Sequence, residues 1–171
     1  RNHDLRGGDR IEVPGLDGYW DVLDVGGHTR GHIAYYRPKI LLCGDALFVL
    51  GCGRLFDGTM TQMADSVARI AALPRDTLVY CAHEYAHLNL PFALAVEPDN
   101  PRLQQRAVTL REDIAAQRPT VPMSLGDELD TNPFLRCDVD AVKRSAGNFR
   151  GHALINRQDV FTALREWRNR L

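Results

Sequence analysis

The sequence predicts a protein of the α/β class (of the α+β kind), with a β-rich part over residues 1–84 and a helical part over residues 85–171. Short runs of aromatic, β-branched and aliphatic residues, bounded by Gly, Pro or Asp, fill the first part. Apolar residues recur at helical spacing in the second part. At 171 residues and 44% hydrophobic composition, the chain is long enough to bury one domain with a small helical annex.

The β-rich part is predicted from runs that alternate with turn signals. A turn at Gly7-Gly8-Asp9 leads into a first strand. The pattern predicts further strands over residues 19–25, 32–36, 40–43 and 77–81, with a tight turn at residues 37–39. Between the last two strands, Met63, Val67, Ile70 and Ala71 recur at helical spacing, and Pro74 ends that predicted helix.

The helical part is predicted to begin with a helix over residues 85–96, closed by Glu97-Pro98. A second helix carries Leu103, Ala107, Leu110 and Ile114 on one face and ends before Pro119. Residues 119–133 contain several Pro and Gly residues and are interpreted as a connector. A last helix over residues 159–170 places Phe161, Leu164 and Trp167 on one face.

Composition excludes several classes of partner. The formal net charge is −1, so no overall field would attract nucleic acid or anionic lipid. The longest apolar runs, at residues 40–43 and 46–50, are far too short to span a bilayer. The cysteines Cys43, Cys52, Cys81 and Cys137 form no CxxC pair or regular framework. They are typical of reduced thiols, which predicts a cytoplasmic location. The charge and the short apolar runs predict that the chain has no nucleic-acid or membrane partner.

The beginning of the chain resembles the middle of a protein. Arg1, not Met, is the first residue, and a turn-then-strand pattern follows almost at once. We therefore expect the chain to be truncated at its N-terminus.

Residue types that bind metals stand at the ends of three predicted strands. His28 follows the strand over residues 19–25, Asp45 follows residues 40–43, and His83 follows residues 77–81. Two imidazoles and a carboxylate suit Zn²⁺ or a similar ion, and a carboxylate can bridge two metals. Each signal alone has a simpler explanation, because Gly-Asp after a strand is commonly a turn or helix cap, and a loop histidine is commonly solvated. Because the pattern occurs three times, a metal site explains it as well as these simpler readings do, and the residues alone leave both open.

Longer motifs resemble a known family. The segment GHTRGHIAY at residues 27–35 and the segment LCGDALF at residues 42–48 are similar to motifs of the metallo-β-lactamase superfamily. Within it, the segments GCGRLFDG (residues 51–58), HEY (83–85) and NLPFA (89–93) resemble hydroxyacylglutathione hydrolase, or glyoxalase II. So do VEP (96–98), PTVP (119–122) and NPFLR (132–136), which belong to the helical annex.

The resemblance implies a fold and a reaction. It implies the second half of a four-layer αββα sandwich, with the first half of the domain missing, followed by a glutathione-binding helical annex. It also implies hydrolysis of S-(2-hydroxyacyl)glutathione, for example S-D-lactoylglutathione, by a metal-bound hydroxide, so that no side chain, including Cys52 and Cys81, is the nucleophile. The expected cofactors are two divalent metal ions, Zn²⁺ by default, with iron or manganese as alternatives.

The resemblance also implies the role of individual residues. His28 would bind one metal, Asp45 would bridge two metals, and His83 would bind the second, while His32 would be structural. The positions that would contact glutathione are Arg54, Phe56, Tyr85, Arg165 and Arg168. Guanidinium groups bind carboxylates in pairs of hydrogen bonds, and Arg165 and Arg168 are neighbours on a helix surface. Without the family, an exposed basic helix face would explain this pair better than a binding site does. Phe56 lacks the hydroxyl group that the family commonly has at its position.

One motif of the family is absent. The HxHxDH segment, which supplies two ligands to each metal, occurs nowhere in the 171 residues. We therefore expect the chain alone to bind metal weakly and to hydrolyse little. The missing residues would also build most of the first sheet, so the remaining sheet would expose an apolar face. We expect its N-terminal part, or a second copy of the chain, to cover that face.

Two other functions stay open. The chain could be a non-catalytic glutathione-binding module that uses Tyr85, Arg165 and Arg168 without metal, and an upstream HxHxDH segment would discriminate against this reading. It could also be another hydrolase of the superfamily, or a persulfide dioxygenase with a single iron ion. The helical annex after Val96 favours glyoxalase II over that third reading.

Overall fold

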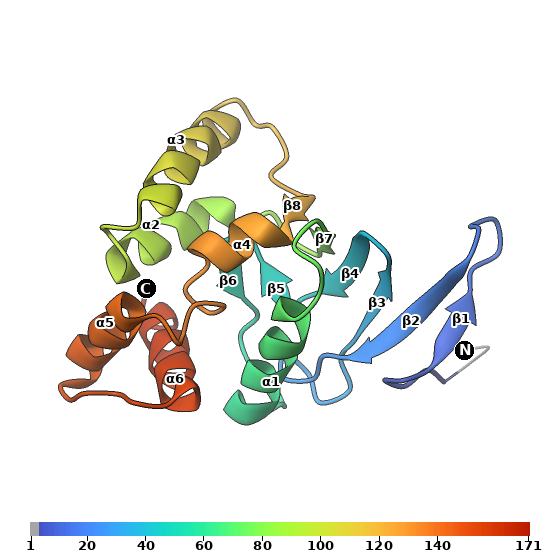
Figure 1. Ribbon diagram of the computed structural model, residues 1–171, viewed down its shortest axis with the longest axis horizontal. Helices are drawn as coiled ribbons and strands as arrows, with labels where there is room; N and C mark the ends of the chain where they lie inside the picture. Colours follow the sequence, from blue (N-terminus) through green and yellow to red (C-terminus); the bar gives the residue numbers. More distant parts are fainter. Residues whose placement is uncertain (1–3) are drawn as a thin grey trace.

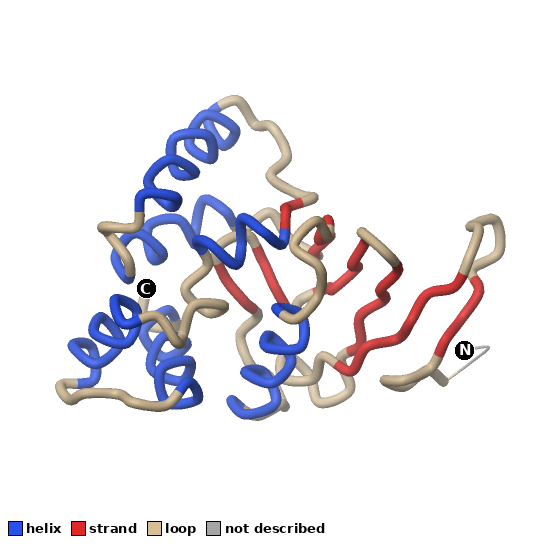
Figure 2. Tube along the Cα trace, in the orientation of Figure 1, coloured by secondary structure: helices blue, strands red, loops and turns tan. Residues whose placement is uncertain are grey.

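The computed structural model describes residues 4–171 and separates strands from helices along the chain (Figures 1 and 2). Strands lie on one side of the molecule and most helices on the other. The strands are β1 (Arg10–Glu12), β2 (Tyr19–Asp24), β3 (Ile33–Arg37), β4 (Ile40–Gly44), β5 (Leu47–Phe48), β6 (Gly51–Cys52), β7 (Leu78–Cys81) and β8 (Met123–Ser124). The helices are α1 (Met60–Ala71), α2 (Ala86–Val96), α3 (Pro101–Ala115), α4 (Leu125–Thr131), α5 (Asp140–Arg150) and α6 (Arg157–Arg168).

Six of the strands form one mixed sheet in the order β1-β2-β3-β4-β7-β8. Neighbouring strands are antiparallel except β4 and β7, which are parallel and are connected through α1. The predicted tight turn at residues 37–39 joins β3 to β4, where Lys39 adopts a positive φ of 72°. All five predicted strands and the helix before Pro74 are confirmed within one to three residues at each end.

The two faces of this sheet differ in burial. Leu41, Val79 and Met123 are partners across β4, β7 and β8, and all three side chains are buried. On the opposite face Leu42 pairs with Tyr80, and the two are 38% and 39% exposed. Leu78 lies on that second face and is 42% exposed. One face is therefore covered by the rest of the chain, whereas the other presents apolar side chains to solvent.

The helical part packs around an aromatic cluster. The rings of Phe92, Phe134, Phe161 and Trp167 lie 5.4–5.7 Å apart, centroid to centroid, in successive pairs from α2, α6 and the segment between α4 and α5. Asn100 caps α3 by accepting hydrogen bonds from the backbone N–H groups of Arg102 and Leu103. The predicted helices over residues 85–96, 103–114 and 159–170 are confirmed within a few residues.

The interpretation of residues 119–133 as a connector is wrong. Met123-Ser124 forms β8, which pairs with β7 and closes the edge of the sheet. The Ser124 side chain then caps α4 by accepting from the backbone N–H of Asp127. A two-residue strand and a seven-residue helix are too short to show a hydrophobic period, so the Pro and Gly residues dominated the sequence pattern. The hairpin of β5 and β6 and helix α5 were not predicted either.

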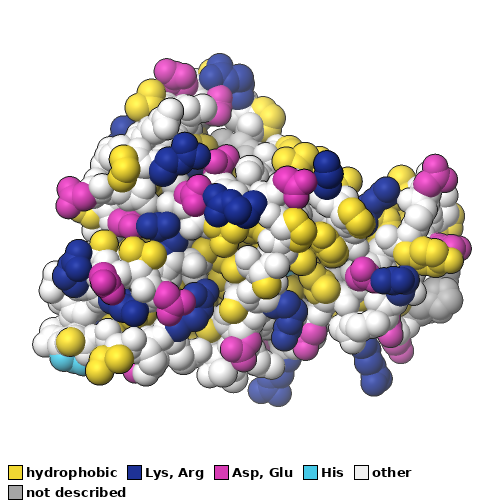
Figure 3. Space-filling view, in the orientation of Figure 1, with side chains coloured by type: hydrophobic (Ala, Val, Ile, Leu, Met, Phe, Trp, Pro, Cys, Tyr) yellow, Lys and Arg dark blue, Asp and Glu magenta, His cyan; other side chains and the backbone are white. Residues whose placement is uncertain are grey.

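Charged side chains spread over the helical part and the β1–β2 hairpin, whereas hydrophobic side chains gather over the middle of the face seen in Figure 3. Within residues 4–171, every helix is too short or too polar to cross a membrane.

Candidate metal centre and substrate pocket

Strand direction brings the three predicted metal ligands together. Both β2 and β4 are antiparallel to β3, and β7 is parallel to β4, so these three strands end at the same edge of the sheet. His28, Asp45 and His83 follow those three ends. The Nε2 atom of His28 lies 3.9 Å from Oδ2 of Asp45, and Nε2 of His83 lies 3.2 Å from Oδ1. Each carboxylate oxygen therefore faces a different imidazole.

A backbone hydrogen bond sets the tautomer of His28. Its Nδ1 atom lies 2.8 Å from the carbonyl oxygen of Arg54. Because a carbonyl only accepts, Nδ1 carries the proton, so in the neutral imidazole Nε2, which faces Asp45, is the nitrogen that can bind a metal. A histidine held in this way is oriented to bind a metal through Nε2.

His32 positions Asp45 and does not face the carboxylate. Its Nε2 atom accepts a hydrogen bond of 3.1 Å from the backbone N–H of Asp45. Gly44 has a φ of 54°, and a Cβ atom there would lie 2.8 Å from Nε2 of His32. The glycine in the Gly-Asp pair is therefore needed both for the left-handed backbone and for this close approach.

Aromatic rings surround His83, which is half-exposed. The His83 and Tyr85 rings stack with centroids 4.8 Å apart, and Phe48 packs edge-on against Tyr85 at 5.0 Å. The backbone N–H of Ala82 donates to the carbonyl of Gly44 and so continues the parallel ladder up to His83. These contacts restrict the position of the imidazole although solvent reaches it.

A cavity of about 540 Å³ opens beside this centre. All eight residues that the sequence proposes as metal ligands or glutathione contacts line it: His28, Asp45, Arg54, Phe56, His83, Tyr85, Arg165 and Arg168. The structure adds residues that sequence reasoning did not single out, namely Phe48, Cys52, Leu88, Asn89, Asn169 and Leu171. Of these, Asn89 lies in the NLPFA motif, a signal that could have been used to find it.

The loop after β6 holds one wall of the cavity. The guanidinium carbon of Arg54 lies 4.7 Å from the Phe56 ring centroid, and Phe56 packs edge-on against His28 at 4.9 Å. The backbone N–H of Phe56 donates to the carbonyl of His28. Phe56 has no hydroxyl group. Its ring packs against the imidazole of His28 and the guanidinium of Arg54.

The two arginines of α6 have different environments. Arg165 is only 5% exposed, donates from Nη1 to the carbonyl of Cys52 at 2.8 Å, and lies over the Phe134 ring. Arg168 is more exposed and donates from Nε to Oδ1 of Asn89 at 3.3 Å. Burial, followed by the charge of Arg165, lowers the pKa of Arg168. Within residues 4–171 neither guanidinium forms an ion pair, so their positive charges are available to an anion.

The cysteines near the cavity are poor nucleophiles. Burial raises the pKa of Cys52, although the charge of Arg165 opposes that shift. Burial also raises the pKa of Cys81 and brings that of Cys43 to about 12. Thiols in such surroundings remain protonated at neutral pH.

The donor set, one carboxylate between two imidazoles, fits part of a two-metal centre. Imidazole nitrogens and a carboxylate are suitable ligands for zinc, iron or manganese. Asp45 sits between the two imidazoles, as a bridging carboxylate would. The described residues contain no group of three or more His, Cys, Asp or Glu side chains around a single point. His28 and Asp45, or His83 and Asp45, would thus supply two ligands to an ion, whereas catalytic zinc sites have three protein ligands.

Comparison with known protein families divides the chain at this centre. Residues 84–171 match the family described as Hydroxyacylglutathione hydrolase C-terminus, and residues 1–83 match the Metallo-beta-lactamase superfamily. The boundary between the two matches falls between His83 and Glu84.

Several curated relatives are similar over nearly the whole chain. A hydroxyacylglutathione hydrolase of Nitrosomonas eutropha is 48% identical and covers 98% of this chain. Proteins of the same name from Aeromonas salmonicida and Pseudomonas aeruginosa are 52% and 50% identical over 96% of it. The chain spans 64–66% of the length of these relatives.

Solved structures confirm the predicted fold class. A metallo-beta-lactamase from Staphylococcus aureus aligns with 96% of this chain and 42% of its own, with a TM-score of 0.54 and 18% identity. The B3 metallo-beta-lactamase BLEG-1 aligns with 78% of this chain and 48% of its own, with a TM-score of 0.51 and 24% identity. At these identities the two structures support the fold alone.

Proposed function

The chain belongs to the hydroxyacylglutathione hydrolase family of the metallo-beta-lactamase superfamily, and on this premise we propose that the whole protein hydrolyses S-(2-hydroxyacyl)glutathione. The products are glutathione and a 2-hydroxy acid, such as D-lactate from S-D-lactoylglutathione. The observation that carries the proposal is that Asp45 and the two arginines of α6 line the same cavity.

Membership of this superfamily implies divalent metal ions, and we propose zinc, with iron or manganese as alternatives. His28 and Asp45 would hold one ion, and Asp45 and His83 would hold the other. The remaining ligands would come from the third of the relatives' length that this chain does not span. When bound, such ions lower the pKa of water to about 7 and supply hydroxide at neutral pH.

The chain's own residues orient the reacting groups. Arg54 holds Nδ1 of His28 through its carbonyl oxygen, and His32 holds the backbone N–H of Asp45. Tyr85 stacks on His83 at the rim of the cavity, where its hydroxyl group can donate to the glutathione moiety. No thiol takes part in the reaction, because burial keeps Cys52 and Cys81 protonated.

The far end of the cavity would bind the carboxylates of glutathione. Arg165 and Arg168 bring two positive charges to it, and Arg54 brings a third to its other wall. Guanidinium groups recognise carboxylates through paired hydrogen bonds. Beside Arg54, Phe56 supplies an apolar surface instead of a hydroxyl donor.

We propose a division of labour at residue 84. Residues 1–84 carry the metal ligands, and residues 85–171 carry Tyr85 and the two arginines. The bare face of the sheet around Leu42, Leu78 and Tyr80 would be covered by an N-terminal part of the same protein or by a second copy. The expected cytoplasmic location is part of the same proposal.

A second candidate function follows from the incomplete ligand set. Residues 4–171 bring together no group of three metal-binding side chains, while Tyr85 and the two arginines of α6 line the cavity. The chain of residues 1–171 taken alone would then be a glutathione-binding module without hydrolytic activity.

Intact mass, elemental analysis and thioester hydrolysis, measured on one preparation of the whole protein, test the main proposal. We expect about two metal ions per chain and hydrolysis of S-D-lactoylglutathione that a chelator abolishes. Asp45→Ala should lose both metal and activity. Hydrolysis that survives both the chelator and Asp45→Ala would contradict the proposal, and glutathione binding without hydrolysis would favour the second candidate.

A further inference from the structure

The hairpin of β5 and β6 lies between the Asp45 centre and the arginines. It begins at Leu47, two residues after Asp45, and ends at Cys52, whose carbonyl oxygen accepts from Arg165. Val49 and Leu50 form its turn. Leu50 has a φ of 56°, in the left-handed region that a leucine rarely adopts. Neighbouring groups must therefore hold this turn in place.

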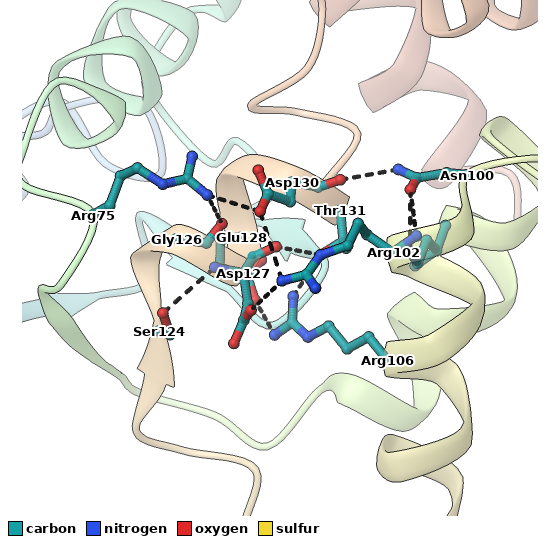
Figure 4. Close-up of polar contacts among 11 residues, drawn as sticks. Arg75, Asn100, Arg102, Arg106, Ser124, Gly126, Asp127, Glu128, Asp130 and Thr131 are labelled. Carbon is teal, nitrogen blue, oxygen red and sulfur yellow. Dashed lines mark hydrogen bonds and ion pairs between the residues drawn. The ribbon is translucent and has the colours of Figure 1, made fainter.

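Helix α4 supplies that support. Glu128 is fully buried and accepts from the backbone N–H of Leu50 at 2.9 Å and from Nδ2 of Asn132 at 2.8 Å. The Asn132 amide also donates to the carbonyl of Gly51 at 3.0 Å. Figure 4 shows Arg106 reaching from α3 to Glu128 and Thr131 on α4, where it pairs with the buried carboxylate. Charge-assisted hydrogen bonds in a buried network hold the turn rigidly.

Asn89 connects this turn to Arg168. It lies on α2, is 6% exposed, and donates from Nδ2 to the carbonyl of Val49 at 2.9 Å. Its Oδ1 accepts from Nε of Arg168 at 3.3 Å, the one hydrogen bond of that guanidinium within residues 4–171. A Cβ atom on Gly51 would lie 2.4 Å from Nδ2, so the amide is packed directly against the hairpin. With Nε engaged by Asn89, both terminal nitrogens of Arg168 are left for a ligand.

We propose that Asn89 is the positioning residue that aims Arg168 into the cavity. Through the β5–β6 turn, it sets the place of this guanidinium relative to Asp45. The pocket then selects thioesters whose carboxylate lies at the matching distance from the carbonyl that is attacked. This inference rests on the proposed function, because it assigns the arginine a carboxylate of glutathione.

Two thioesters with the same acyl group test the proposal on the whole, metal-loaded protein. S-D-lactoylglutathione carries the glutathione carboxylates, and S-D-lactoyl-N-acetylcysteamine carries none. For Asn89→Ala we expect kcat/KM for the glutathione thioester to fall about tenfold, through a rise in KM. The reason is that a misplaced Arg168 would lose about one hydrogen bond to the substrate carboxylate. The value for the cysteamine thioester should change less than about twofold, within the range of ordinary surface substitutions. Equal losses for both thioesters would overturn the proposal, because they would mean general damage to the site.

Further variants separate positioning from packing. In an Arg168→Ala background, Asn89→Ala should cause no further loss with the glutathione thioester, whereas an independent, additive loss contradicts the proposal. Gly51→Ala should reproduce the effect of Asn89→Ala, since its Cβ atom displaces the same amide. Asn148→Ala, an exposed asparagine on α5, is the matched control and should change neither thioester.

Direct binding keeps the two proposals distinguishable. Titration with glutathione should give a Kd about tenfold weaker for Asn89→Ala than for the unsubstituted protein. An unsubstituted protein that binds glutathione but hydrolyses neither thioester would contradict the proposed function and leave the positioning role to be judged on Kd alone. Hydrolysis with an unchanged Kd and KM in Asn89→Ala would overturn the positioning role and leave the proposed function intact.

Discussion

At the scale of single residues, the two arginines of α6 differ in what holds them. Arg165 is buried and donates to the carbonyl of Cys52 and to the side chain of Asn169, so it stabilises the fold. It also contributes a positive charge to the cavity. Arg168 is more exposed, and its side chain has one hydrogen bond within residues 4–171, to Asn89. A sequence pattern of two arginines three apart cannot separate these roles, because the spacing shows only that they share a helix face.

Substitution of each arginine by methionine should reveal this difference. Arg165→Met should lower the free energy of unfolding by about 1.5–3 kcal/mol, because it removes hydrogen bonds from a buried charged group. Arg168→Met should lower it less, by about 0.5–1 kcal/mol, because this partly buried side chain makes one hydrogen bond, at 3.3 Å. Both should raise KM for S-D-lactoylglutathione. Urea unfolding and steady-state kinetics measure the two effects, and an equal loss of stability in both variants would contradict the assignment.

Cys137 should make stability depend on pH in the alkaline range. Burial raises its pKa from the ordinary value of 9.0 to about 12, so the folded chain keeps a proton that the unfolded chain loses above pH 9. The unfolded state then binds fewer protons, and the free energy of unfolding falls as pH rises between about 9 and 12. We expect the stability difference between the unsubstituted protein and Cys137→Ala to shrink over that range. Urea unfolding of both at pH 8 and pH 11 measures it, and a constant difference would mean that the pKa of Cys137 is the same in the folded and unfolded chains.

At the scale of elements, α4 supports the β5–β6 turn through Glu128 and also carries an exposed ion pair through Asp127. Figure 4 shows Glu128 beside Arg106 and Asp127 beside Arg102. Glu128 is buried and contacts Leu50, Arg106 and Asn132. Asp127 is exposed and lies 3.9 Å from a terminal nitrogen of Arg102. The two neighbouring acidic residues therefore make a matched pair for a test.

Glu128→Ala should lower the free energy of unfolding by about 3–5 kcal/mol, because it leaves a partly buried Arg106 without its partner. The Leu50 N–H would also lose its acceptor. Asp127→Ala should cost about 1 kcal/mol or less, since exposed ion pairs and first-turn carboxylates contribute little. Urea or thermal unfolding distinguishes them. Similar losses would show that the buried network does not hold the turn.

At the scale of the whole molecule, the sheet has one covered face and one bare face. The bare face exposes Leu42, Leu78 and Tyr80 on adjacent strands. Contiguous exposed apolar side chains of this kind mark interfaces in soluble proteins. The chain covers 64–66% of the length of its curated relatives.

The chain of residues 1–171, prepared alone, should therefore self-associate. Sedimentation velocity should show species larger than 19.2 kDa. The double substitution Leu42→Lys, Tyr80→Lys should shift the distribution toward the monomer, because it places two charges on the bare face. The exposed Leu16, on the connection between β1 and β2, offers a control in Leu16→Lys, which should leave association unchanged. A monodisperse monomer of the unsubstituted chain would contradict the prediction.

The sequence by itself determined the class of fold, most of the longer elements (α5 is the exception) and the three places where candidate metal ligands stand. These features are local: alternating strands, helical periods and turn residues act over a few positions, and the motifs that indicate the family are contiguous. His28, Asp45 and His83 could be proposed because each directly follows a strand.

Only the tertiary structure decided what depends on contacts between distant residues. The strands β5, β6 and β8 have two residues each and exist through their partners, so no local pattern indicates them. Asn89 connects Val49 with Arg168 across 40 and 79 positions of the chain. Strand direction brings the three candidate metal ligands together, and burial distinguishes Arg165 from Arg168. Such contacts form when the chain folds back on itself, and their partners cannot be read from neighbouring residues.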